Sequence, residues 1–303
     1  METNGMTGSQ FHLFGTKRFL PLLVTAILGA ANDNIFKNAM AILVLYVVAD
    51  QTPISGSIIL TIATGVFILP FFLFSATAGT LADKYDKSLL CRYIKFSEIL
   101  IMCLGAAALT IGNTYFLLFV LFLMGTQSSF FGPVKYSMLP TLLREHELIG
   151  GNAIVEAGTF LAILFGTIAG ALLITLENGT SLVGFILLSL AVIGWISSFQ
   201  IPRSFASQPK LSINPNIFSE TLSVVQRARK NRAVFLSILG ISWFWLSGAT
   251  LLTQYPNYAK LVFNADNYVV TLFLVVTSIG IGIGSLLCNA FLKGKISAQY
   301  VPV

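Results

Sequence analysis

The chain has 303 residues, of which 55% are hydrophobic and only 10% are charged, and its mean hydropathy is +0.83. A soluble domain carries about 25% charged residues, so this composition predicts a polytopic membrane protein and leaves no room for a separate soluble domain. The net charge of +6 could suggest nucleic acid as a partner. The basic residues, however, lie in short loops on one side of the predicted helices, which favours the membrane and excludes nucleic acid.

Long apolar runs separated by polar turns predict the membrane helices in chain order. Residues 1–17 are expected to form a cytoplasmic tail, and residues 201–232 form the one sizeable connector that is not apolar. A helix needs about 20 apolar residues to cross a bilayer. The expected helices cover residues 19–49, 57–78, 89–111, 115–137, 152–175, 181–200, 233–254 and 268–292.

The connector 201–232 predicts an amphipathic helix. Asn214 can cap a helix that starts at Pro215, and apolar residues then recur at helical spacing. The segment ends in a basic cluster, Arg227, Arg229, Lys230 and Arg232. Such a helix would lie on an anionic membrane surface, and the alternative is a solvated linker whose charges only set the topology.

The distribution of basic residues predicts the orientation of the chain. All 18 Lys and Arg residues except Lys37 and Lys260 fall on the side of the N-terminus, and the positive-inside rule places that side in the cytoplasm. Six helices, a long basic linker and further helices form the layout of a six-plus-six transporter. We therefore expect an all-α bundle with a cytoplasmic tail (1–17), a six-helix half (18–200), a linker (201–232) and an incomplete second half (233–303), from a fragment of a twelve-helix protein or a chain completed by other helices.

The first apolar run carries polar residues at its centre, Asn32, Asp33 and Asn34, with Lys37 one turn further on. A charge at this depth costs about 2.5–3.5 kcal/mol on insertion scales and usually faces a bundle interior or a wet cavity. The pattern therefore indicates a polar site inside a transport cavity. The alternative is that Asp33 pairs with Lys37 at i,i+4 and only holds the helix among its neighbours.

Two further features concern packing. Gly166 and Gly170 form a G-x-x-x-G pair that predicts close packing of the fifth helix on a neighbour, and the glycines of the last helix are interpreted in the same way. At the start of the third helix, Arg92 and Lys95 are expected to snorkel or to touch lipid phosphates, and Glu98 can pair with Lys95 at i,i+3. The three cysteines show no metal-ligand spacing or disulfide pattern, and no cofactor motif is present. The glycine-rich stretch 280–284 lies within a membrane helix, which excludes a dinucleotide site.

The segment between the second and third helices carries the sharpest motif. Gly79-x-x-x-Asp83-Lys84-x-x-Lys87 resembles the loop 2–3 motif of the major facilitator superfamily. The family pattern has a glycine where Asp86 stands and a basic residue where Ser88 stands. By this resemblance the four motif residues would act as a gate or latch between the two halves, because Asp83 could accept hydrogen bonds from a helix N-terminus or pair with a basic residue.

More of the chain resembles one branch of that superfamily, the bacterial lysophospholipid transporters. The matching stretches are residues 32–34, 82–83, 131–136, 152–157, 166–170, 240–245 and 284–288. The last two look most like members fused to an acyltransferase and an acyl-carrier-protein synthetase, possible partners whose domains this chain lacks. The resemblance implies a multi-pass protein of the bacterial inner membrane that flips lysophospholipid, chiefly lysophosphatidylethanolamine, for reacylation.

A zwitterionic head group needs both charge signs nearby, and the resembling segments offer them. Asp33, with Asn32 and Asn34 beside it, and Glu156 could meet an ammonium group, while Lys135 could meet a phosphate. Alternatively Lys135 snorkels to the inner interface, and Glu156 is a structural partner for Lys135 or for a loop residue.

Two other functions stay open from the sequence. One is a small-molecule or drug facilitator of the same fold, with Asp33 as a proton or cation site. The other is a non-transporting membrane region of a larger lipid-modifying protein. No nucleophile is paired with a base, so the chain is not expected to be an enzyme.

Overall fold

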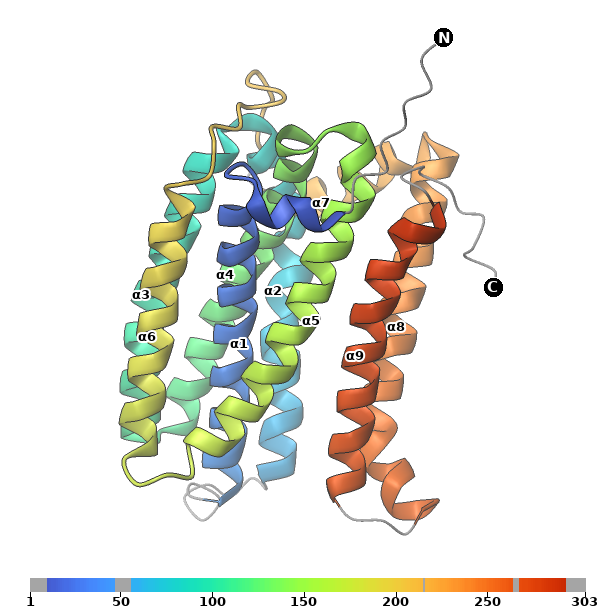
Figure 1. Ribbon diagram of the computed structural model, residues 1–303. Coiled ribbons are helices and arrows are strands. Elements are labelled where there is room, and N and C mark those ends of the chain that lie inside the picture. Colours follow the sequence, from blue (N-terminus) through green and yellow to red (C-terminus); the bar gives the residue numbers. More distant parts are fainter. Residues whose placement is uncertain (1–9, 47–55, 215, 264–266, 293–303) are drawn as a thin grey trace.

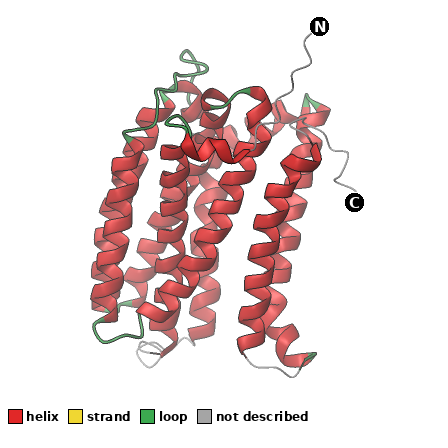
Figure 2. Cartoon of the chain, viewed as in Figure 1, coloured by secondary structure: helices red, strands yellow, loops and turns green. Residues whose placement is uncertain are grey.

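The computed structural model describes residues 10–46, 56–214, 216–263 and 267–292, and this part of the chain is built from helices joined by short loops (Figures 1 and 2). A short 3₁₀ helix, η1 (Gln10–Gly15), comes first, and another, η3 (Glu145–Glu147), precedes the fifth long helix. The α-helices are α1 (Leu20–Tyr46), α2 (Gly56–Lys84), α3 (Lys87–Ile111), α4 (Thr114–Leu142), α5 (Leu148–Leu173), α6 (Gly179–Ser198), α7 (Ile217–Arg229), α8 (Arg232–Leu261) and α9 (Asn267–Leu292).

Six of the described helices are long and apolar enough to cross a membrane: α2, α3, α4, α5 with η3, α6 and α9. By length alone, α1 with 27 residues and α8 with 30 also suffice. The structure therefore confirms the expected all-α bundle. Helices α1 to α6 pack together, and α8 and α9 form a pair that meets this bundle through α9 and α5 (Figure 1).

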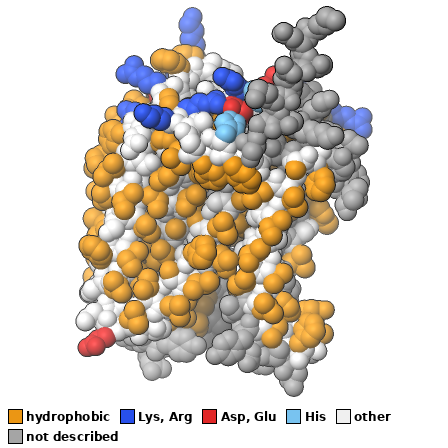
Figure 3. Space-filling view, in the orientation of Figure 1, with side chains coloured by type: hydrophobic (Ala, Val, Ile, Leu, Met, Phe, Trp, Pro, Cys, Tyr) orange, Lys and Arg blue, Asp and Glu red, His pale blue; other side chains and the backbone are white. Residues whose placement is uncertain are grey.

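The two ends of the bundle differ in charge. Lys and Arg side chains gather at the end that carries η1 and the α6–α7 connector (Figure 3), which we call the basic end. The sides of the molecule in the same view are covered by hydrophobic side chains. This is the surface expected of a bundle whose sides face lipid and whose ends face water.

Two helices extend past the limits expected from the sequence, through residues that usually end a helix. Helix α2 continues to Lys84, so Gly79 and Asp83 lie in its last turns and not in a loop. Helix α4 continues through Pro133 and Pro140 to Leu142. Both helices continue past these residues because a helix satisfies its backbone N–H and C=O groups internally where no water can do so.

Glycines bring α1 and α5 close together, as the G-x-x-x-G pair predicted. A Cβ atom added to Gly166 would lie 2.8 Å from the Ala31 carbonyl oxygen, and one added to Gly170 would overlap the carbonyl of Ile35. The corresponding prediction for α9 is wrong within the described residues, because Cβ atoms at Gly280, Gly282 and Gly284 would meet open space.

Gly170→Ala should lower the stability of the bundle by about 1–3 kcal/mol, because the added methyl group meets backbone that cannot move without displacing α1. Gly65→Ala on α2 is the matched control, since its Cβ would meet nothing within 4 Å and alanine favours the helix by about 1 kcal/mol. Thermal unfolding in detergent would compare the two. Equal midpoints for both variants would contradict the close approach of α1 and α5.

Candidate functional site

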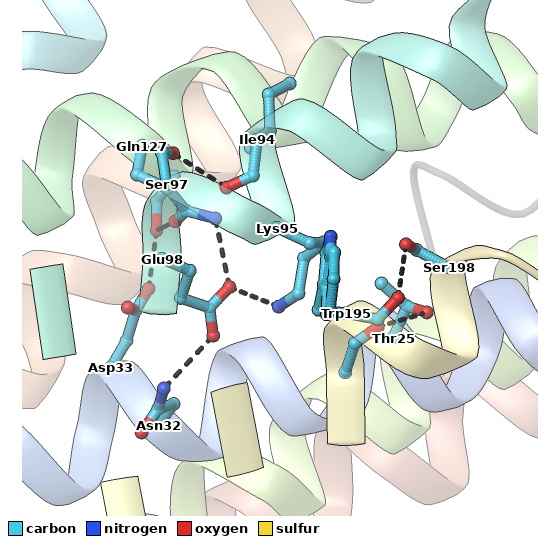
Figure 4. Close-up of polar contacts among 12 residues, drawn as sticks. Thr25, Asn32, Asp33, Ile94, Lys95, Ser97, Glu98, Gln127, Trp195 and Ser198 are labelled. Carbon is cyan, nitrogen blue, oxygen red and sulfur yellow. Dashed lines mark hydrogen bonds and ion pairs between the residues drawn. The ribbon is translucent and has the colours of Figure 1, made fainter. Parts of the chain in front are cut away.

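The centre of the six-helix bundle contains a buried ion pair between Lys95 and Glu98 on α3 (Figure 4). Their exposed fractions are 0% and 2%. Glu98 also accepts hydrogen bonds from Asn32 Nδ2 at 3.1 Å and from Gln127 Nε2 at 3.0 Å. Three donors from three helices thus converge on one carboxylate, which satisfies a charge that would be costly to bury alone.

Lys95 occupies a slot between two glycines. A Cβ atom at Gly29 on α1 would lie 3.1 Å from the ammonium nitrogen, and one at Gly194 on α6 would lie 3.1 Å from Lys95 Cε. The centroid of the Phe131 ring lies 5.4 Å from the ammonium nitrogen. The expectation that Lys95 snorkels to the interface is therefore wrong, because the i,i+3 ion pair and the glycine slot hold it inside the bundle.

The three polar residues at the centre of α1 face three different helices. Asn32 donates to Glu98 on α3, and Asp33 Oδ2 accepts from the hydroxyl of Ser128 on α4 at 2.6 Å. The β-carbon of Asn34 lies against Gly166 of α5, and its amide donates to the carbonyl of Ala30 at 2.8 Å. Because successive residues of a helix point about 100° apart, one short stretch of α1 contacts three neighbours.

Asp33 and Lys37, one helical turn apart on α1, each contact a residue of another helix. The ammonium group of Lys37 lies over the ring of Phe67, 4.5 Å from the ring centroid, while the carboxylate of Asp33 turns to Ser128. Both residues are half-buried. The interpretation of Asp33 as a partner of Lys37 stays an alternative, because the two opposite charges still attract each other.

Lys135 and Glu156 form a second polar group, nearer the basic end. The hydroxyl of Tyr136 on α4 donates to Glu156 on α5, and the ammonium group of Lys135 lies 4.4 Å from the centroid of the Tyr136 ring. Lys135 follows Ser128 by two helical turns, which corresponds to about 10 Å along α4. The five predicted substrate residues are thus divided between two levels, and Tyr136, which the sequence analysis did not single out as a site residue, joins the second.

The predicted latch motif holds the connector that follows α6. Lys87 is buried, and its ammonium group donates to the Phe205 carbonyl at 3.0 Å and to Ser207 Oγ at 2.8 Å. The Asp83 carbonyl accepts from the backbone of Gln208 at 2.8 Å. Lys84 lies near the ring of Tyr85, and a Cβ at Gly79 would meet open space.

The two departures from the family motif have local roles. The carboxylate of Asp86 accepts from Leu89 N at 3.1 Å and caps α3, which a glycine could not do. The hydroxyl of Ser88 donates to the Pro202 carbonyl at 2.7 Å and accepts from Ser204 N at 2.8 Å. Both residues therefore fix the start of α3 and the path of the connector over it.

Lys87→Met should release the connector, because two hydrogen bonds from a buried ammonium group are lost. Hydrogen bonds to charged groups contribute about 1.5–3 kcal/mol each, so we expect cleavage by trypsin at Arg203 and Lys210 to accelerate about tenfold or more. Lys84→Met is the control, since its side chain does not hold the connector. If both variants are cut at the wild-type rate, Lys87 does not anchor this segment.

Helix α7 lies against α2 and begins later than expected. Asn216, rather than Asn214, caps it by accepting from Ser219 N at 3.1 Å, and Pro215 lies outside the described residues. Glu220 is buried and accepts from the hydroxyl of Thr80 at 2.6 Å. The face of α7 that carries the buried Glu220 therefore packs against the protein, whereas Phe218 and Leu222 remain exposed.

A further ion cluster at the basic end did not emerge from the sequence. Glu147 accepts two hydrogen bonds from Arg18, at 2.6 and 2.8 Å, one from the backbone of Arg144 at 2.8 Å, and lies 3.1 Å from His12 Nε2. Residues separated by more than 120 positions meet here, so no local pattern could reveal the contact. The cluster ties η1 to the beginning of α5.

Long apolar helices around a polar centre define a membrane transporter bundle, and the comparisons with known proteins agree. The chain matches the Major Facilitator Superfamily over residues 22–302, and it belongs to this family. It is similar to the "Lysophospholipid transporter LplT" of Escherichia coli O1:K1 / APEC, with 30% identity over 225 residues, which cover 73% of this chain and 54% of that protein. The protein of the same name from Escherichia coli O139:H28 (strain E24377A / ETEC) is 30% identical over 223 residues, with the same coverage of 73% and 54%. The chain thus spans about half the length of the curated relatives it matches.

Proposed function

We propose that the protein moves lysophospholipid, chiefly lysophosphatidylethanolamine, across the bacterial inner membrane for reacylation, and that it transports without catalysing a reaction. The observation that carries this proposal is the group formed by Lys135, Tyr136 and Glu156, which presents a cation and an anion on two facing helices. A zwitterionic head group requires both signs within a short distance. The names of the similar proteins support the same substrate class.

Within this proposal each charged residue has a role. Lys135 binds the phosphate as a point charge, and Glu156 binds the ammonium group once it exchanges its contact with Tyr136. Asp33, supported by Asn32 and Asn34 on α1, supplies a second carboxylate about two turns deeper. The head group can then pass from one carboxylate to the other, while its acyl chain stays against the apolar sides of the helices.

We further propose that the basic end of the bundle faces the cytoplasm, because Lys and Arg are retained on that side during insertion. Gly79, Asp83, Lys84 and Lys87 then lie at the inner surface, where they would act as a latch on the two halves. The bonds from Lys87 to the connector support this role, because the connector joins the halves. Acyltransferase and acyl-carrier-protein synthetase domains are the partners that would consume the transported lipid.

The head-group assignment can be tested by replacing one charge at a time. Lys135→Met and Glu156→Gln, made in the full-length protein in proteoliposomes, should each raise the KM for lysophosphatidylethanolamine about tenfold or more, because a charged hydrogen bond contributes about 1.5–3 kcal/mol. Lys230→Met at the exposed end of the linker helix is the control and should leave KM unchanged. Unchanged KM in both site variants would refute the assignment.

A further inference from the structure

Helix α7 lies at the basic end of the bundle (Figure 1), and a groove of about 250 Å³ runs between it and α2. Phe72 and Leu73 of α2 form one wall of the groove, and Phe218, Leu222 and Val225 of α7 form the other. Phe72 and Phe218 are 68% and 69% exposed. Large apolar side chains therefore line a groove that the described part of the chain leaves uncovered.

The side of α7 that faces the groove ends in a cation. Four residues follow each other at spacings of four, three and four, which places them on one side of a helix: Phe218, Leu222, Val225 and Arg229. The guanidinium carbon of Arg229 lies over Phe235 of α8, 5.5 Å from the ring centroid. A guanidinium in this position keeps the N–H groups at its edge available to an anion.

The opposite side of α7 holds the helix on the protein and uses a different arginine. The carboxylate of Glu220 is buried, accepts from the hydroxyl of Thr80 at 2.6 Å, and lies 3.4 Å from Arg227 Nη2. Glu220 is the only acidic residue in the described stretch 216–263. Arg229 forms no ion pair with any residue that the structure describes, so its charge is left for a partner outside the chain.

The groove lies deeper than the contact that holds α7. Thr80 stands eight residues after Phe72 on α2, which corresponds to about 12 Å along the helix, and α2 ends at Lys84 at the basic end. The apolar walls therefore lie where acyl chains fill the leaflet, whereas Arg229, at the end of α7, lies with the head groups. An amphipathic helix in the interface has this distribution of apolar and charged side chains.

We propose that the groove binds an acyl chain of an anionic membrane phospholipid, and that Arg229 binds the phosphate of this lipid. A guanidinium can meet two phosphate oxygens with parallel N–H bonds. The excess of basic residues at the end of α7 favours a lipid with a net negative charge over a zwitterionic one. Because Arg229 also lies over Phe235, the bound lipid connects α2 of the first half with the start of α8.

This site is separate from the proposed path of the transported lipid, which passes Asp33 and Glu156 inside the bundle, and it does not rest on the proposed function. Native mass spectrometry of the full-length protein would count the phosphatidylglycerol molecules that it retains from mixed micelles. Wild-type protein should retain phosphatidylglycerol in preference to phosphatidylcholine. Arg229→Met should reduce this retention about tenfold, because a charged hydrogen bond is lost.

Lys230→Met is the matched control for the phosphate contact. It removes the same charge from the next position, about 100° around the helix, and should leave the retention of phosphatidylglycerol near the wild-type level. Equal retention of both lipids by the wild-type protein would overturn the proposal. So would equal losses in Arg229→Met and Lys230→Met, since the effect would then come from overall charge and not from a site.

A second pair of variants tests the groove. Thr221→Trp fills it and should reduce retention about as strongly as Arg229→Met, whereas Gln226→Trp adds the same ring at an exposed position outside the groove and should not. Glycerol phosphate, a head group without acyl chains, should not displace the lipid, and neither should lysophosphatidylethanolamine at the same concentration. Normal retention in Thr221→Trp, or displacement by either compound, would show that the groove is not a phospholipid site.

Discussion

Glu98→Leu alone should destabilise the bundle by about 3–5 kcal/mol, because it leaves the ammonium group of Lys95 buried without its partner. Lys95 is fully enclosed in the slot between Gly29 and Gly194. Asn32 and Gln127 would lose their acceptor at the same time. The free energy of unfolding in detergent, measured with increasing denaturant, would give the loss directly.

The double variant Lys95→Met with Glu98→Leu is the informative control. Removing both charges takes away the desolvation cost, so most of the lost stability should return. Glu177→Ala, at an exposed turn, should have an effect within about 0.5 kcal/mol. A double variant that is as unstable as Glu98→Leu would show that the loss came from packing and not from the unpaired charge.

Asp33→Asn should abolish uptake of lysophosphatidylethanolamine by the full-length protein, whereas Asp33→Glu should only weaken it. The first change keeps the shape of the side chain and its contact with Ser128 but removes the charge. The second keeps the charge and moves it by one methylene group. A unit charge pair about 4 Å apart gains roughly 4 kcal/mol at an effective dielectric constant near 20, before the cost of desolvation.

Asn38→Ala supplies a control on the same helix. Asn38 donates to the hydroxyl of Thr167 at 3.2 Å, so its loss affects the contact of α1 with α5 and leaves the carboxylate of Asp33 in place. Uptake by this variant should fall far less than in Asp33→Asn. Near-normal uptake by Asp33→Asn would exclude Asp33 from the transport path.

The membrane helices could be predicted from the sequence because apolar runs of sufficient length have few other stable structures in a bilayer. Their ends could not be placed accurately. Gly79, Asp83 and Pro133 are loop or break signals in the sequence, yet they continue α2 and α4. In a bilayer the backbone hydrogen bonds of the helix outweigh this local preference. The sequence also predicted Asn214 as the cap of α7, whereas Asn216 caps it. Two residues that can cap a helix stand close together here, and the sequence does not distinguish them.

The polar centre was predictable only in part. Asn32 and Asp33 stood out because polar residues are rare at mid-membrane depth, but their partners Gln127 and Ser128 lie on another helix, and no spacing in the chain connects them. Lys95 shows the limit most clearly. Its position near the start of a helix predicted a side chain that reaches the membrane interface. Two glycines far away in the sequence instead create the slot that buries it.

We propose that this facilitator carries lysophospholipid by recognising both charges of its head group. The most direct test of this claim is the movement of labelled lysophosphatidylethanolamine from the outer to the inner leaflet of proteoliposomes that contain the full-length protein. We expect saturable transfer of lysophosphatidylethanolamine that Lys135→Met reduces about tenfold or more at low substrate concentration. Transfer no faster than in protein-free liposomes, or transfer that Lys135→Met leaves unchanged, would contradict the claim.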